Sequence, residues 1–73
     1  MSEQDRQERF KRVASLRVDK VLFNIRSLSK CSNTSNYSYT RQDVNKMWRA
    51  VDEELRICKA AFRKSKKNDR FSF

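Results

Sequence analysis

Three arginines recur at intervals of seven residues in the C-terminal half of this 73-residue chain, at Arg49, Arg56 and Arg63. If this region is an α-helix, each interval spans about 10.5 Å and returns to nearly the same side of the helix. A row of cations on one helix face can contact the phosphates of a nucleic acid, although it is equally typical of a solvated face. The side chains that we expect to contact phosphates are Arg49, Arg56, Lys59, Arg63, Lys64, Lys66 and Lys67.

The charge balance supports the same interpretation. The chain has 18 Lys and Arg against 9 Asp and Glu, which gives a net charge of +9. Such an excess attracts polyanions, with nucleic acid first and an anionic membrane surface or an acidic protein second. A basic protein without any polyanionic partner is the remaining alternative. Because no set of Asn, Gln and Arg converges on one narrow helix face, we expect phosphate contacts with weak sequence preference.

Acidic residues interrupt the arginine row in its middle. Glu53 is placed to pair with Arg49 and with Arg56, and Asp52 with Arg56, because residues three or four apart are neighbours on a helix. Beyond Lys59 no acid follows until Asp69. The most basic part of the chain is therefore expected at the end of this helix.

Catalytic chemistry is not expected from these residues. The chain has no His and no Gly, so it has neither a Gly-rich phosphate loop nor a histidine base. The adjacent acids Asp52, Glu53 and Glu54 would point in different directions from a helix, so they do not form a catalytic pair. We expect no enzyme, no cofactor, no metal site and no small-molecule substrate.

The two cysteines, Cys31 and Cys58, are expected to be free thiols. Cys58 would lie roughly 25 Å from the start of the second helix, whereas Cys31 lies near the connecting loop. Disulfide-bonded cysteines have Cα atoms within about 7 Å of each other. Free thiols indicate a reducing compartment. The charged N-terminus and the lack of a long apolar run predict a cytoplasmic chain without a membrane span.

The clearest helix signal begins at Thr40. Thr40 and Asp43 resemble a capping box, with Asp replacing the better-fitting Glu, and Tyr39 and Val44 are placed for a hydrophobic staple. The spacing then predicts a helix over residues 41–65. Its apolar stripe consists of Val44, Trp48, Val51, Leu55, Cys58 and Phe62, with Met47 beside them.

A first helix is predicted over residues 3–29, with Ser2 as a possible N-cap. Its apolar stripe consists of Phe10, Ala14, Val18, Val21, Ile25 and Leu28, widened by Leu22. Leu16 and Phe23 lie about 160° away from the centre of that stripe. They are either simply exposed or form a second contact surface for a protein partner or for self-association.

A polar loop is predicted over residues 30–40, and its stretch 31–40 contains no charged residue. The loop is either a solvated linker or an ordered segment in which Asn33 or Asn36 adopts a left-handed conformation in place of Gly. Tyr37 could stack on a base or contact a protein, but a structural role is favoured. The basic and aromatic tail over residues 66–73 is expected to fray, with a small docking motif as the alternative.

Together these elements predict one small all-α domain over residues 1–73, a two-helix antiparallel hairpin. Its seam would join Val18, Val21, Ile25 and Leu28 to Val44, Trp48, Val51 and Leu55. A unit of this size with 37% hydrophobic residues is expected to need a partner, a second copy or a ligand surface to fold firmly.

Three segments carry a resemblance to a known group of proteins: RFKRVA at 9–14, NIRSLSKCSN at 24–33 and NYSYTRQDV at 36–44. In these segments the chain resembles small, mostly uncharacterised helical proteins of Firmicute phages and conjugative mobile elements. It departs from them in having Trp48 where Phe is expected and in a more basic second helix. The resemblance implies a helical hairpin and a mobile-element setting, without an established activity or binding residues.

The sequence thus favours a small mobile-element accessory protein that binds nucleic-acid phosphates. The alternative is a protein-interaction module or inhibitor, for example of a host defence nuclease. It would act through Leu16 and Phe23 or through the 31–40 loop.

Overall fold

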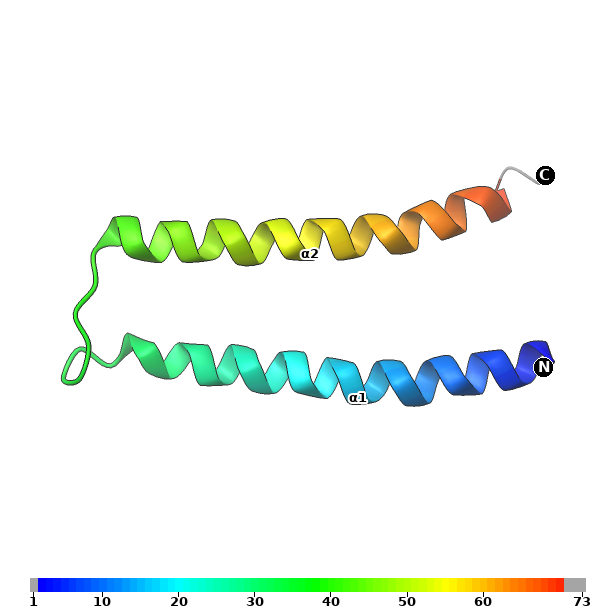
Figure 1. Cartoon of the computed structure of the whole chain (residues 1–73), viewed down its shortest axis with the longest axis horizontal. Coiled ribbons are helices and arrows are strands. Elements are labelled where there is room, and N and C mark those ends of the chain that lie inside the picture. Colours follow the sequence, from blue (N-terminus) through cyan, green and yellow to red (C-terminus); the bar gives the residue numbers. More distant parts are fainter. Residues whose placement is uncertain (1, 71–73) are drawn as a thin grey trace. The chain divides into compact units, whose positions relative to one another are not determined.

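The computed structural model describes the backbone of residues 2–70 and the side chains of residues 2–64. Helix α1 spans Glu3–Ser29, the 3-10 turn η1 spans Lys30–Ser32, and helix α2 spans Arg41–Arg70 (Figure 1). Residues 2–70 contain no strand, so the all-α prediction is confirmed. The chain divides into two compact units, Met1–Ser38 and Tyr39–Phe73.

Helix α1 begins at the predicted cap. The Oγ atom of Ser2 accepts the backbone N–H of Asp5 at 3.1 Å, and the Ser2 carbonyl accepts the N–H of Arg6 at 3.1 Å. Glu3 and Asp5 place negative charge in the first turn, where the helix dipole favours it. An exposed ion pair of 3.4 Å joins Glu3 to Arg6. The first turn is therefore capped and helical from Glu3.

The segment after α1 forms an ordered turn built on Asn33. Its carbonyl accepts the N–H groups of Asn36 at 3.2 Å and Tyr37 at 3.0 Å, while its Oδ1 accepts the N–H of Ser35 at 2.9 Å. No residue in the described backbone has a positive φ, so the expected left-handed conformation of Asn33 or Asn36 is wrong. The reason is that the Asn33 side chain closes the turn itself, which lets the backbone stay in common regions.

Helix α2 begins at a complete capping box. Thr40 Oγ1 accepts the N–H of Asp43 at 3.1 Å, and Asp43 Oδ2 accepts the N–H of Thr40 at 2.9 Å. The N–H of Val44 then donates to the Thr40 carbonyl at 3.2 Å. The shorter Asp side chain thus completes the reciprocal bond that Glu usually makes.

The end of α2 lies beyond the predicted residue 65. The helix continues to Arg70, because the last turns contain neither Gly nor Pro to end it. The tail predicted over 66–73 overlaps this stretch. Its side chains, and residues 71–73 altogether, lie outside the described residues.

Neither unit encloses a core of its own. No side chain over residues 2–64 is buried. Half-buried positions are Val13, Ala14, Leu28, Val44, Met47 and Ala60. The predicted seam residues other than Leu28 and Val44 are exposed, from 37% at Val51 to 55% at Val21. Each helix therefore presents an apolar stripe that its own unit leaves uncovered.

Candidate nucleic-acid interface

The predicted phosphate-binding residues lie on α2, in the second unit. Arg49, Arg56, Lys59, Arg63 and Lys64 are all exposed on this one helix. The three arginines drift by only about 20° around the helix for each interval of seven residues, so they form a nearly straight row. The side chains of Lys66 and Lys67, also predicted to contribute, lie outside the described residues.

Arg56 is engaged by a neighbouring acid. Its Nε donates to Glu53 Oε1 at 3.0 Å and its Nη2 donates to Glu53 Oε2 at 2.7 Å. The predicted Glu53–Arg56 pair is confirmed. The Arg49–Glu53 and Arg56–Asp52 pairs are not formed in the part of the chain with described side chains.

This pair changes the protonation equilibria of both partners. The hydrogen bonds from Arg56 lower the pKa of the Glu53 carboxyl below its ordinary value, and the same bonds raise the pKa of Arg56. Both groups therefore stay charged at neutral pH. The charge of Arg56 is offset by a carboxylate within hydrogen-bond distance, so Arg56 attracts a phosphate less than an unpaired arginine does.

The C-terminal part of the row has no such compensation. Residues 57–68 include five Lys or Arg and no Asp or Glu. Within the described side chains, Lys59, Arg63 and Lys64 take part in no ion pair. The uncompensated positive charge of α2 is therefore concentrated in this segment rather than in the middle of the arginine row.

The residues predicted for protein contact lie in the first unit. Leu16 and Phe23 on α1 are 61% and 66% exposed, the highest values among the large hydrophobic residues with described side chains. Tyr37 is 53% exposed and is held through its backbone N–H by the Asn33 carbonyl. The described residues of the two predicted surfaces thus belong to different units.

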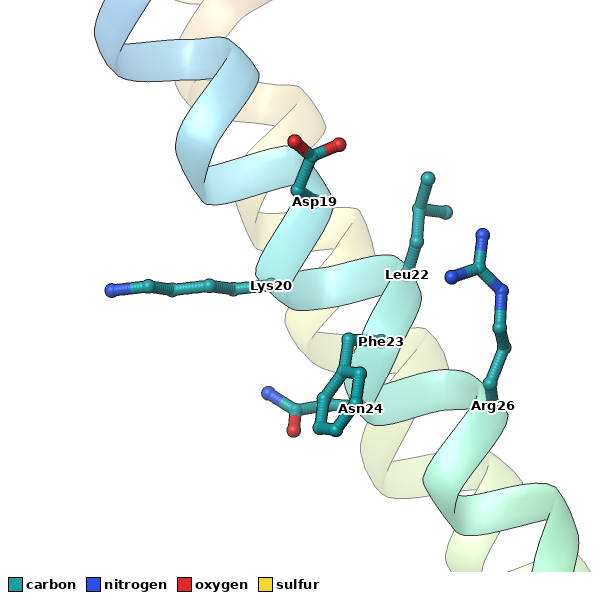
Figure 2. A pocket seen from close by; sticks show the side chains of 6 residues that line it. All are labelled: Asp19, Lys20, Leu22, Phe23, Asn24 and Arg26. Atoms are coloured by element: carbon teal, nitrogen blue, oxygen red, sulfur yellow. The ribbon is translucent and has the colours of Figure 1, made fainter.

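Sequence reasoning missed the surroundings of Phe23. An open depression on α1 is lined by Asp19, Lys20, Leu22, Phe23, Asn24 and Arg26. Figure 2 shows Leu22 and Arg26 extending from one side of the helix and Lys20 and Asn24 from the other, with Phe23 between them. The signal that could have revealed this surface is the seven-residue spacing of Asp19 and Arg26, which puts opposite charges on one line.

Two further predictions bear on the environment of the chain. Cys31 and Cys58 are both free and exposed, as expected. Among the described residues, neither helix has a stretch that is long and apolar enough to cross a membrane.

Comparisons of the chain with protein-family models, with curated proteins and with solved structures found no match in any of the three.

Proposed function

We propose that this protein binds the phosphates of nucleic acids through α2, with weak sequence preference. The observation that carries the proposal is the acid-free segment 57–68 with its five cations. Each Lys or Arg that neutralises a phosphate releases condensed counterions, and this release supplies most of the affinity of sequence-independent binding. Within the arginine row, Arg63 is expected to contribute more than Arg56, whose guanidinium is shared with Glu53.

The test is binding of the full chain to a fluorescent DNA duplex and to a single strand across a salt series. Log affinity should fall linearly with log salt, with a slope of about −0.9 for each phosphate neutralised on a duplex. A triple charge reversal, Arg56→Glu, Lys59→Glu and Arg63→Glu, should abolish binding at physiological salt.

A matched variant distinguishes the effect of the α2 segment on affinity from the effect of net charge alone. Reversing Arg9, Lys11 and Arg12 on α1 to Glu lowers the net charge by the same amount. This variant should keep most of the affinity if α2 is the interface. Equal losses in both triple variants, or no binding by the wild-type chain, would contradict the proposal.

We also propose that the two helices form the antiparallel hairpin expected from the sequence. Its support is that each helix carries an apolar stripe left exposed by its own unit, as at Val21 and Trp48, which are 55% and 45% exposed. Mutual coverage of two stripes is the usual way in which a helix pair obtains a core. The basic row of α2 lies away from its stripe, so it would stay accessible.

A second candidate function is a protein-interaction module or inhibitor, favoured by the exposure of Leu16 and Phe23. An apolar interface need not show the salt dependence of phosphate binding, so the salt series separates the two functions. The resemblance to mobile-element proteins would make either activity an accessory function of a phage or conjugative element. We place the protein in the cytoplasm, where two exposed thiols stay reduced.

A further inference from the structure

We propose that α1 binds a second copy of this chain in antiparallel orientation through the depression around Phe23. In this arrangement Asp19 of each copy lies opposite Arg26 of the other. The proposal concerns the first unit and does not depend on nucleic-acid binding by α2.

The apolar part of this surface is open to solvent. Phe23 is 66% exposed, and the adjacent Leu22 is 43% exposed. Both line the same depression on α1 (Figure 2). A solvent-exposed aromatic ring beside an aliphatic side chain, rimmed by charges, is typical of a protein contact surface.

The charges of Asp19 and Arg26 indicate which partner binds this surface. Asp19 and Arg26 are separated by seven residues, so they lie on nearly the same line of the helix. A second α1 running in the opposite direction reverses the order of the two charges. One register then places Asp19 opposite Arg26 twice, related by a twofold axis near residues 22 and 23.

The same register brings the apolar residues together. Because the twofold axis passes near Leu22 and Phe23, each of these side chains lies close to its own copy on either side of the two ion pairs. The surface is thus complementary to itself, as the contact of a symmetric dimer must be. Neither Asp19 nor Arg26 has an ion-pair partner among the described side chains.

The line of Asp19, Phe23 and Arg26 is separate from the apolar stripe of α1, and Leu22 lies between the two. The centre of the Asp19–Arg26 line lies about 130° around the helix from the line of Val18, Val21 and Ile25. A second copy bound at Phe23 and a helix packed on the stripe could therefore be accommodated at the same time.

The test is sedimentation equilibrium of the full chain and its charge variants over a range of concentrations, with circular dichroism to verify helicity. The wild-type chain should show a monomer–dimer equilibrium. Asp19→Arg and Arg26→Asp should each weaken dimerisation at least about tenfold, because each places like charges opposite each other. Phe23→Ala should weaken it as well. Lys46→Asp on α2, which changes the net charge as much as Arg26→Asp, should leave the dimer intact.

Restoration experiments test the register. The double variant Asp19→Arg/Arg26→Asp should dimerise about as well as the wild type. An equimolar mixture of the two single variants should form a heterodimer, since each then supplies the charge that the other requires. A wild-type chain that stays monomeric, single variants that dimerise normally, or a double variant that fails to recover would each overturn the proposal.

Discussion

The guanidinium of Arg56 donates two hydrogen bonds to the carboxylate of Glu53, 3.0 Å from Nε to Oε1 and 2.7 Å from Nη2 to Oε2. The two residues are three apart on α2 and both side chains are exposed, so the paired hydrogen bonds form within a single turn of the helix. In the middle of the arginine row, the Glu53 carboxylate therefore competes with any phosphate for the guanidinium of Arg56. Any phosphate that binds Arg56 must displace Glu53 or share the guanidinium with it.

If α2 binds nucleic acid as proposed, removing the Glu53 carboxylate should strengthen that binding. Glu53→Gln eliminates a negative charge from the basic row and frees Arg56 for one more phosphate contact. We expect affinity to rise several-fold, and the salt slope for duplex DNA to become steeper by about 0.9. Fluorescence anisotropy across a salt series measures both quantities.

Glu54→Gln is the matched control for that change. It removes the same charge, but Glu54 lies about 160° around α2 from Arg56. Its slope should stay that of the wild type, with only a small rise in affinity. If both variants bind equally well, net charge rather than the local Glu53–Arg56 pair determines the affinity.

The helix should lose stability in acid because of Asp43. A hydrogen bond from the Thr40 N–H, aided by one between the two side chains, lowers the pKa of the Asp43 carboxyl in the folded chain. A carboxyl group with a lowered folded-state pKa stabilises the fold above its unfolded-state pKa of about 3.9. That contribution is lost as the pH falls through the lower folded-state value.

Circular dichroism between neutral pH and strong acid measures this effect. The helicity of the wild type should exceed that of Asp43→Asn by a constant amount down to about pH 5, and the difference should shrink below about pH 4. A difference that is unchanged in strong acid would exclude the carboxylate as its source.

Features that depend on residues three or four apart could be predicted from the sequence. The Ser2 cap, the Thr40–Asp43 box and the Glu53–Arg56 pair all follow from side chains that meet within one helical turn. The backbone conformation of Asn33 could not be predicted in this way. A left-handed residue and a side-chain hydrogen bond both close such a turn, and the residue type allows both.

The same distinction between local and long-range features applies to the candidate sites. Residue types alone identify the cations of α2, because charge depends little on the fold. Helical spacing also singles out Leu16 and Phe23. Asp19 and Arg26 were not singled out from the sequence, and the structure groups them with Leu22 and Phe23 because all four line one depression. What covers each apolar stripe depends on contacts between residues that are far apart in the sequence. Helical periodicity shows which face of a helix is apolar, but it does not show what packs against that face.

The capping box should contribute measurably to the stability of α2. Thr40→Ala removes the oxygen that accepts the Asp43 N–H, and loss of an N-cap oxygen typically costs about 1 kcal/mol. Thermal or urea unfolding followed by circular dichroism measures the change. Thr34→Ala is the control, because Thr34 lies in the turn after η1 and its hydroxyl caps no helix. Equal melting of the two variants would show that the box adds nothing in solution.

Trp48 offers the most direct test of the proposed hairpin. It is the only tryptophan in the chain, and its side chain is 45% exposed. If α1 covers the remaining surface, Trp48→Ala should cost about 3–5 kcal/mol, the usual effect of removing a packed aromatic residue. Ile57→Ala, at a similarly exposed position of 48% but outside the stripe, should cost much less.

Nuclear Overhauser effects between the Trp48 indole and the methyl groups of Leu28 should be visible in the folded chain. Unfolding of Trp48→Ala that matches the wild type, together with no such effects, would rule out this seam, and α2 would then need a different partner for its apolar stripe.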